Sequence, residues 1–414
     1  MILKKVAERR LCPHCLGRLF AKIGSGLTNK ERGVILRNAI DKGIDEGIEK
    51  LFETKIDASN EGWDFECMLC QNLFKELEHF SDLVIESLSE FEFDNFLIGC
   101  KVDEGIVKRE EALWSELKID TAELIKSEIN RELGKLVGAR LDKNVEFSNP
   151  EVVAVIDTRF NSVEVQVSPL FIYGRYRKLI RGIPQTKWHC KKCWGKGCEH
   201  CDFKGKMYET SVEEIIAEHI LNASKGEEHF FHGMGREDID ARMLGNGRPF
   251  IIEIRRPRIR KLELDELMDE INKKNKGKVE ISDLRFSGRD EIVRIKNAKV
   301  KKTYRVLIEC EKRLNNQKVK EVVCTLSGKT VKQKTPLRVV HRRSDKEREK
   351  RVHSIELESL NRKEALLLIT GDSGLYIKEF ITGDKGRTEP SISQELGMAC
   401  RVKELDVIMI HDEV

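Results

Sequence analysis

Eight of the twelve cysteines are arranged as four Cys-x-x-Cys pairs, a spacing that places two thiolates on one turn of the chain. Four such thiolates complete a tetrahedral zinc shell and leave no position open for water, so the pairs indicate structural rather than catalytic zinc. An iron–sulfur cluster would use the same ligands, and the spacing does not distinguish the two. The predicted ligands are Cys12, Cys15, Cys67 and Cys70 for one site and Cys190, Cys193, Cys198 and Cys201 for the other.

The two predicted sites differ in how directly the spacing supports them. The last two pairs are separated by four residues, two of them glycines, which suits a tight turn between two knuckles. The first two pairs lie farther apart than those of a zinc ribbon, and we expect them to join each other. The remaining Cys100, Cys310, Cys324 and Cys400 are expected to be small buried hydrophobes without a role in chemistry.

A second pattern is a run without any acidic residue, from Val165 to Cys198. Its arginines and lysines alternate with aromatic residues such as Tyr173 and Trp188. Cationic groups bind phosphates and aromatic rings stack on bases, so this run predicts contacts with RNA. A second acid-free run extends from Thr325 to Ser344. The RNA-binding residues predicted in the first run are Arg175, Arg177, Lys178 and Arg181.

The residues most suited to catalysis lie between His232 and Phe250, where glycines, acids and arginines crowd ahead of an apolar run. Loops of this composition usually carry functional sites. Asp238 and Asp240 are two residues apart and offer carboxylates that could act as nucleophile or base.

The segment GREDIDARMLGNGRPF, residues 235–250, resembles the signature of the archaeal and eukaryotic tRNA pseudouridine synthases of the Pus-ten type. Similar matches are KTYRV (302–306), KQKTPLRVVHRR (332–343) and GLYIKEFITGDKGRTEP (374–390), so the resemblance covers the whole second half. In the first half, the cysteine pairs and the segment SPLFIYGRYRKLIRGIPQTKW, residues 168–188, resemble a THUMP-type RNA-binding domain.

The resemblance implies one essential aspartate, typically followed five residues later by glycine. Asp240 with Gly245 fits this spacing, whereas Asp238 fits only the Arg-x-Asp form of a sister family. Tyr304 matches the active-site tyrosine that stacks on the target base, and Lys378 matches the basic residue that pairs with the catalytic aspartate. The resemblance further implies that Ile377 packs against the tyrosine, Tyr376 contacts the substrate and Leu405 forms an apolar wall.

The activity implied is conversion of uridine to pseudouridine in the TΨC arm of tRNA, at uridine 55 and in archaea also at uridine 54. This reaction breaks an N-glycosidic bond, rotates the base and makes a C–C bond. It therefore needs a carboxylate, a stacking surface, exclusion of water and a base flipped out of its stack. We expect tRNA as the partner and no organic cofactor.

The residues do not fit a methyltransferase, a deaminase or a protein with a nucleotide-binding phosphate loop. A methyltransferase needs a glycine-rich nucleotide loop after a strand, and none is evident. A deaminase needs His-x-Glu with Pro-Cys-x-x-Cys, which is absent, and the SGKT at 327–330 lacks the first glycine of a phosphate loop. The alternative that remains is a zinc-containing tRNA-binding protein without catalytic activity.

The composition is that of a soluble globular protein, with 40% hydrophobic and 35% charged residues in 414. No stretch approaches the roughly 18 apolar residues of a membrane span, and the first residues lack an apolar signal core. We therefore expect a cytoplasmic protein without membrane contact or disulfide bonds. The net charge of +4 decides nothing about nucleic acid.

The elements that position these residues are read from periodicity. Helices are predicted around residues 31–50, over much of 71–136, and after a capping box formed by Ser211 and Glu214. Strands are predicted at 152–158 and 163–167, and strands alternate with helices from residue 250 onward.

The fold expected is α+β: a pseudouridine-synthase catalytic domain with a mixed, mainly antiparallel sheet, and a zinc-binding accessory domain that contains the THUMP-type part. The predicted parts are a zinc-knuckle region (1–75), a THUMP-like domain (76–187), a second cysteine knuckle or linker (188–205) and the catalytic domain (206–414).

Overall fold

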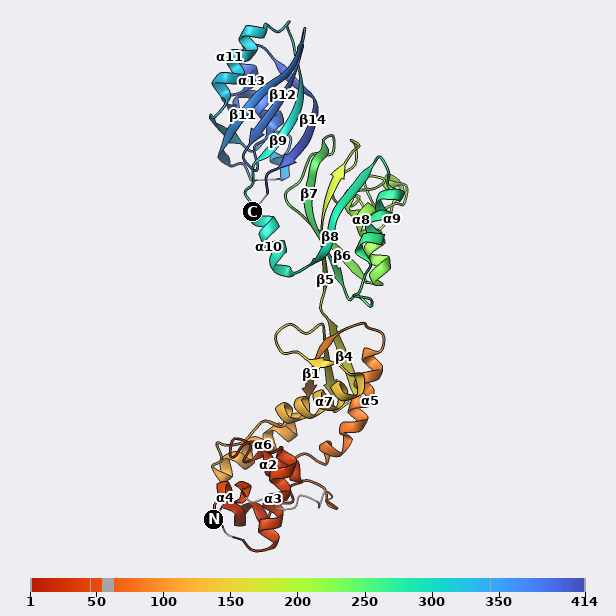
Figure 1. The fold of residues 1–414 in the computed structure, drawn as a ribbon, viewed down its shortest axis with the longest axis vertical. Helices are drawn as coiled ribbons and strands as arrows, with labels where there is room; N and C mark the ends of the chain where they lie inside the picture. Colours follow the sequence, from red (N-terminus) through yellow and green to blue (C-terminus); the bar gives the residue numbers. More distant parts are fainter. Residues whose placement is uncertain (1, 45, 54–62, 343, 413–414) are drawn as a thin grey trace. The chain divides into compact units, whose positions relative to one another are not determined.

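The computed structural model describes residues 2–44, 46–53, 63–342 and 344–412. Arg343, at the end of the second acid-free run, lies outside these residues. The chain forms two compact units, Met1–Ser168 and Pro169–Val414, which are described separately (Figure 1).

Helices make up most of the first unit. The predicted helix at 31–50 is two helices, because a turn at Gly43 ends the first, which begins with a capping box between Thr28 and Glu31. The helices are α1 (Ile2–Ala7), α2 (Pro13–Arg18), α3 (Asn29–Asp41), α4 (Ile48–Glu53), the 3-10 helix η1 (Leu73–Glu76), α5 (Leu77–Leu88), α6 (Glu104–Leu117) and α7 (Ile125–Leu141).

A four-stranded mixed sheet completes the first unit, in the order β2-β1-β3-β4. Its strands are β1 (Asn95–Lys101), β2 (Asn144–Val145), β3 (Val152–Asp157) and β4 (Ser162–Val167). The predicted strands at 152–158 and 163–167 are confirmed as the antiparallel pair β3 and β4. Strand β1 lies inside the segment predicted to be mainly helical. Its parallel partners, β2 and β3, come more than forty residues later in the chain, so local periodicity did not reveal it.

The second unit contains a ten-stranded sheet in the order β13-β10-β11-β12-β9-β14-β7-β5-β8, with β6 paired to β7 beside this path. Only β14 and β7 pair in parallel among the described strands of this sheet, which confirms a mixed, mainly antiparallel sheet. The strands are β5 (Leu170–Lys178), β6 (Glu228–Gly233), β7 (Arg242–Arg255), β8 (Val279–Ser287), β9 (Lys302–Cys310), β10 (Thr330–Lys334), β11 (Glu347–Asn361), β12 (Glu364–Gly371), β13 (Thr388–Glu389) and β14 (Cys400–Ile410).

Helices cover the sheet in two groups, with α8 and α9 beside β6 and β8, and α11 beside β11 with α13 next to α11 (Figure 1). Ser211 is the N-cap of α8, as predicted, because the Glu214 backbone N–H donates to Ser211 Oγ over 3.2 Å. The Glu214 carboxylate in turn accepts a hydrogen bond of 2.8 Å from the Ser211 hydroxyl. The helices are α8 (Val212–Ser224), α9 (Leu264–Lys274), α10 (Arg289–Asn297), α11 (Asn316–Leu326), α12 (Ile377–Thr382) and α13 (Ile392–Leu396), with 3-10 helices η2 (Glu199–Cys201), η3 (Val340–Arg342) and η4 (Asp384–Gly386).

The boundary between the units differs from the one expected from the sequence. Residues 169–187 were expected in the RNA-binding part, but β5 lies between β7 and β8 in the sheet of the second unit. The second unit therefore begins at Pro169 rather than at residue 206. The cysteine cluster at 188–205 marks a local change in composition inside this unit and not a boundary.

One disulfide corrects the expectation that there is none. Cys310 at the end of β9 and Cys400 at the start of β14 are bonded to each other. The two strands are antiparallel and their register places these two residues directly opposite each other. Sequence spacing gave no sign of this pair, because ninety residues separate its members.

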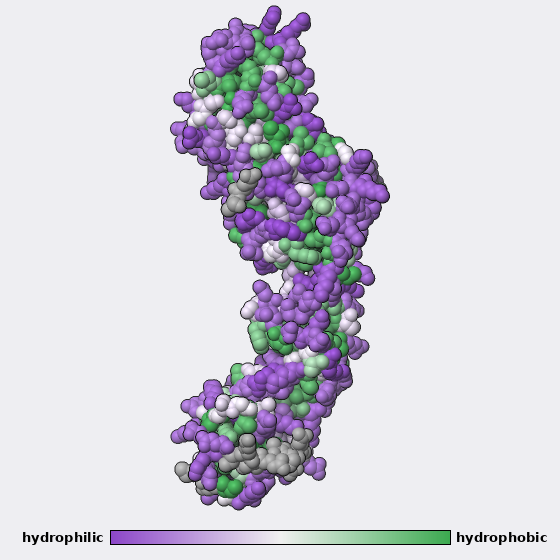
Figure 2. Space-filling view, in the orientation of Figure 1, coloured by the Kyte–Doolittle hydropathy of each residue, from purple (hydrophilic) through white to green (hydrophobic). Residues whose placement is uncertain are grey.

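No helix in the described part of the chain is long and apolar enough to cross a membrane. The face drawn in Figure 2 is mostly hydrophilic, with smaller apolar areas among the polar side chains. The apolar side chains instead form one core in each unit.

Candidate active site and metal centres

The loop that carries Asp238 and Asp240 leads directly into β7, where that strand meets β14. The register pairs Arg242 with Asp406, and the Arg242 guanidinium binds the Asp406 carboxylate through two hydrogen bonds of 3.0 and 2.6 Å. Gly245 has a φ of +56°, and a Cβ atom there would lie 1.7 Å from the Ile408 carbonyl oxygen. The glycine five residues after Asp240 is thus required for the close approach of β7 to β14.

The five substrate-contact residues predicted from the sequence come together. A cavity of about 270 Å³ opens beside the loop, at the meeting point of β9, β14 and the start of α12. Tyr304, Ile377 and Leu405 are buried in its walls, since each is less than 10% exposed. All five residues line this cavity: Tyr304, Tyr376, Ile377, Lys378 and Leu405.

Both candidate aspartates contact Lys378. The Lys378 ammonium donates to both carboxylate oxygens of Asp240, at 2.7 and 2.6 Å. It lies 3.4 Å from Asp238 Oδ2, and Asp238 also accepts a hydrogen bond of 3.1 Å from the Arg338 guanidinium. The pairing of Lys378 with a carboxylate is therefore present, and its closest carboxylate is that of Asp240.

The two aspartates differ in position. Asp238 lines both the cavity that contains Tyr304 and an adjoining cavity of about 180 Å³, whereas Asp240 lines only the adjoining one, together with Trp188 and Lys378. The Asp240 side chain is 68% exposed and that of Asp238 32%. Burial acts to raise the pKa of Asp240, but the hydrogen bonds and charge of Lys378 outweigh it and hold the pKa below that of an ordinary aspartic acid. Asp240 is thus an ionised and accessible carboxylate.

Several residues of the site were not identified from the sequence. Buried Glu237 accepts hydrogen bonds of 2.8 Å from the Tyr176 hydroxyl and 2.9 Å from Arg248 Nε. Lys302 also lines the cavity, and burial together with the Arg248 charge lowers its pKa to about 7. Burial raises the pKa of Tyr304 to about 12, so this phenol is neutral at physiological pH.

The position of Tyr376 is fixed by a residue from another strand. Gln333 of β10 is fully buried, and its side chain accepts from the Tyr376 N–H at 2.9 Å and donates to the Tyr376 carbonyl at 3.0 Å. Glu237, Arg248, Lys302 and Gln333 all lie within the matched segments, but nothing in the order of residues showed that their side chains would turn toward this site.

The structure corrects the role expected for the basic run at 175–181. Lys178 is completely buried, and its ammonium donates to the carbonyls of Ile183, Asp238 and Ile239 at 3.0–3.3 Å. Arg181 donates to the Asp240 carbonyl at 2.8 Å and forms an ion pair with Asp406. These two cations hold the backbone of the aspartate loop, so the prediction that Lys178 contacts phosphate is wrong.

The other two cations of this run are also bound within the chain. Arg175 donates to both carboxylate oxygens of Asp412, at 2.8 and 3.1 Å, and its side chain is only 14% exposed. Arg177 pairs with Glu280, although its side chain is 49% exposed. Of the four, Arg177 is the one with a largely accessible side chain.

Lys178→Met should therefore disturb the conformation of the aspartate loop without weakening RNA affinity. The variant removes the partner of three carbonyls and of buried Glu237, and breaking a buried ion pair costs roughly 3–5 kcal/mol of unfolding free energy. We expect a lower melting temperature and a slower reaction, with no change in the salt dependence of tRNA binding. The control is Arg177→Gln, at an exposed pair, which should alter stability by less than about 0.5 kcal/mol. A stable Lys178→Met with a flattened salt dependence would restore the phosphate-contact role.

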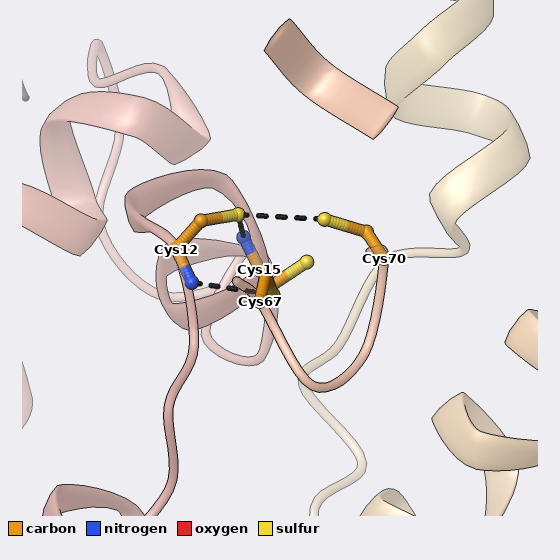
Figure 3. A group of neighbouring side chains, drawn as sticks. All are labelled: Cys12, Cys15, Cys67 and Cys70. Atoms are coloured by element: carbon orange, nitrogen blue, oxygen red, sulfur yellow. Dashed lines mark hydrogen bonds between the residues drawn. The ribbon is translucent and has the colours of Figure 1, made fainter. Parts of the chain in front are cut away.

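The first two cysteine pairs join, as expected from the sequence. Cys12 caps the N-terminus of α2 and Cys15 lies within that helix, while Cys67 and Cys70 lie on the loop ahead of η1. Their sulfur atoms lie within 4.8 Å of one another (Figure 3). Cys12 Sγ and Cys70 Sγ are 3.7 Å apart, close to the edge of about 3.8 Å that four Zn–S bonds of about 2.3 Å require. All four cysteines are completely buried in the core of the first unit.

The second cysteine group forms on residues 188–207, which we call the second knuckle. Its four sulfur atoms also lie within 4.8 Å of one another, with separations of 3.8–4.0 Å between neighbours. The backbone N–H groups of Gly197 and Gly205 donate to Cys193 Sγ and Cys201 Sγ at 3.2 Å, which favours thiolates. Both groups therefore match the donor number and spacing of a tetrahedral thiolate metal site.

Comparison with known protein families matches both units. The family model described as "Pus10, C-terminal" matches residues 171–411, and the one described as "Pus10 THUMP domain, archaeal" matches residues 80–157. The THUMP match thus ends within β3, and the segment 168–188 that resembled a THUMP domain falls almost wholly in the C-terminal match.

Curated relatives are similar over nearly their full length. The tRNA pseudouridine synthase Pus10 of Methanothrix thermoacetophila is 44% identical, over 96% of this chain and 91% of the relative. That of Methanocaldococcus jannaschii is 42% identical over 99% and 93%, and that of Pyrococcus furiosus is 38% identical over 100% and 99%.

Similarity to solved structures is weaker. The structure of a Cbf5-Nop10-Gar1 complex aligns with a TM-score of 0.31 and 17% identity, over 48% of this chain and 45% of that one. A pseudouridylate synthase aligns with a TM-score of 0.22 and 12% identity, over 61% and 71%.

Proposed function

Because this chain belongs to the Pus10 family of tRNA pseudouridine synthases, we propose that it isomerises uridine to pseudouridine in tRNA and that Asp240 is the reacting carboxylate. The observation that carries the assignment of Asp240 is its pairing with Lys378 at 2.6 and 2.7 Å, beside the cavity that contains Tyr304. This pairing joins two segments separated by more than 130 residues, and both match the family signature.

The arrangement suits an isomerisation without redox chemistry. The N1–C1′ bond of uridine breaks, the base turns, a C5–C1′ bond forms, and the proton from C5 is replaced by one on N1. The Asp240 carboxylate attacks or deprotonates during this sequence, and Lys378 keeps it ionised. Tyr304 offers its ring to the flipped base, while Ile377 and Leu405 provide apolar walls that exclude water.

The substrate position follows from the family resemblance. We place the target at uridine 55 of the TΨC arm, with uridine 54 as a second target. The THUMP-type domain of the first unit supports tRNA as the partner. No organic cofactor is needed for the bonds that break and form.

The decisive experiment is incubation of the purified chain with an unmodified tRNA transcript, followed by mapping of pseudouridine by mass spectrometry. We expect pseudouridine at position 55, and a transcript with cytidine at that position serves as the control. Binding of the transcript without any pseudouridine would instead identify a tRNA-binding protein without catalytic activity. Pseudouridine at other positions alone would keep the activity and overturn the target.

We also infer that each group of four cysteines holds a structural zinc ion. The support is the donor set, four thiols with separations close to those of a tetrahedral zinc site, because four thiolates complete the shell of a structural zinc ion. The ion would organise the surrounding chain and take no part in the reaction. The absorption spectrum of the purified protein tests this identity, because iron–sulfur clusters absorb visible light and zinc does not.

Lys378→Met should slow the reaction by about 10²-fold at its pH optimum and shift the acid limb of its pH profile to higher pH. Lys378 lowers the pKa of Asp240, and the reaction requires the ionised carboxylate. Without Lys378 the carboxyl group binds its proton at a higher pH, so activity is lost earlier as the pH falls. Single-turnover rates of the native protein and the variant, measured at a series of acidic pH values, locate this acid limb of the pH–rate profile. An acid limb that stays in place or moves to lower pH would contradict the role of Lys378.

A further inference from the structure

The second knuckle presents two large aromatic side chains to solvent. Trp194, directly after Cys193, is 82% exposed, and Phe203, two residues after Cys201, is 73% exposed. They are the most exposed large apolar side chains in the described part of the second unit. Burial in a core therefore does not account for either ring.

The backbone conformation does not explain why large aromatic residues occupy positions 194 and 203. Trp194 has a φ of +54° and Phe203 a φ of +58°, both in the left-handed region that glycine occupies at lower cost. Their N–H groups bond to the carbonyls of Cys190 and Cys198 at 2.9 Å, so both conformations belong to the turns that follow the cysteines. Two bulky rings thus stand where the turns favour a small residue, and outliers of this kind cluster at functional sites.

The charge around the rings is positive. Five lysines and two acidic residues lie in the second knuckle, Glu199 and Asp202 being the acids. A cationic surface with isolated aromatic rings favours single-stranded nucleic acid, whose phosphates pair with the lysines and whose bases stack on the rings. Protein–protein interfaces are instead depleted in lysine. The lysines are Lys191, Lys192, Lys196, Lys204 and Lys206.

The knuckle is attached next to the candidate active site. Trp188 at its start lines the same cavity as Asp240 and Lys378. The two ends of the knuckle are joined by a backbone hydrogen bond of 2.9 Å from the Met207 N–H to the Trp188 carbonyl, and by one of 2.8 Å from the Cys190 N–H to the Gly205 carbonyl. Lys206 further pairs with Glu214 of α8. The rings are therefore presented by an ordered hairpin that begins at the wall of the site.

We propose that Trp194 and Phe203 stack on unpaired bases of the substrate RNA, and that the exposed lysines of the second knuckle, Lys191, Lys192, Lys196 and Lys204, hold the adjoining phosphates. This inference rests on the proposed function, because the RNA is the one whose uridine reacts. Flipping the target uridine leaves neighbouring bases without their usual stacking partners, and exposed rings can replace those partners. The second knuckle is then a substrate-binding element as well as a metal site.

The test is a Trp194→Ala/Phe203→Ala variant of the full chain, assayed for tRNA affinity by fluorescence anisotropy and for single-turnover rate. Loss of one base-stacking ring weakens binding by about 5- to 100-fold. For the double variant we therefore expect the Kd for tRNA to rise by at least about 5-fold. The rate at saturating tRNA should stay within about twofold of the native rate, because the rings do not touch the reacting atoms. Binding of a fully paired RNA duplex should not change.

Three controls separate the possible outcomes. Trp194→Phe should retain affinity and Trp194→Leu should lose it, since leucine is apolar but has no ring to stack. Phe286→Ala removes another exposed ring of the same unit, 46% exposed on β8, and should have no effect. The metal content of each variant must equal that of the native protein, so that loss of the metal site is not the cause.

An unchanged Kd for the double variant would overturn the proposal. Equal tRNA affinity of Trp194→Leu and Trp194→Phe would also overturn it, because it would indicate an apolar contact, such as one with a protein partner, instead of stacking. Affinity is measured without reference to catalysis. If the native protein formed no pseudouridine, the proposed function would fail while the stacking role would still be tested by binding.

Discussion

Asp240→Asn is expected to abolish pseudouridine formation, by roughly 10⁴-fold or more, while tRNA affinity and folding stay close to native. Asparagine has nearly the same shape, and the side chain at this position is 68% exposed, so the substitution leaves no buried gap. It removes the negative charge that Lys378 contacts at 2.6 and 2.7 Å, and with it the group that attacks or deprotonates. Single-turnover assays with excess enzyme measure the chemical step directly.

Asp238→Asn is the matched control, because both carboxylates contact Lys378 and lie two residues apart on the same loop. Asp238 is also held by Arg338, so its loss should slow the reaction by disturbing the loop but leave measurable turnover. If Asp238, which lines the cavity that contains Tyr304, were instead the catalytic aspartate, the inactive variant would be Asp238→Asn. Substantial pseudouridine formation by Asp240→Asn, with a native melting temperature, would end our assignment of the catalytic residue.

Loss of the metal at the first cysteine site should unfold the first unit. Its four cysteines belong to the same core as the surrounding leucines, and structural zinc contributes on the order of 10 kcal/mol or more to small domains. The buried Arg18 guanidinium lies 3.5 Å from Cys15 Sγ and pairs with Glu110, so loss of the metal thiolates also leaves a buried cation without part of its compensation. We expect Cys70→Ser to lose hydrogen-exchange protection throughout the described residues of 2–168, with weak catalysis remaining in the second unit.

Cys193→Ser at the second site is the comparison. This cysteine is only partly buried and the second knuckle lies outside the core of the second unit, so the ten-stranded sheet should stay protected while exchange rises in residues 188–207. Elemental analysis of the native protein should give two zinc ions per chain. Less than one metal ion per chain in freshly purified protein, together with a folded first unit, would be inconsistent with both metal assignments.

Patterns that are local in sequence predicted much of the site. The Cys-x-x-Cys spacing predicted both ligand groups, because two thiolates on one turn already form half of a tetrahedral site. The family resemblance of residues 235–250 and 374–390 implied that Asp240 and Lys378 pair, and Lys378 does bind Asp240. The Ser211 N-cap of α8 and the pair β3 and β4 were equally local, since each depends on residues close together in the chain.

The sequence by itself thus determined the chemical groups: eight thiols in two metal-binding sets, the aspartate loop and five residues of the cavity. Only the tertiary structure decided the role of the basic run at 175–181, because the sequence does not distinguish a lysine that binds phosphate from one that binds backbone carbonyls. Lys178 and Arg181 bind the backbone of the aspartate loop because β5 inserts between β7 and β8, which lie more than sixty residues later in the chain. The Cys310–Cys400 disulfide and the boundary at Pro169 depend on strand register in the same way. The register of strands that no hairpin turn joins depends on which buried faces meet in the folded chain, so a local pattern does not specify it.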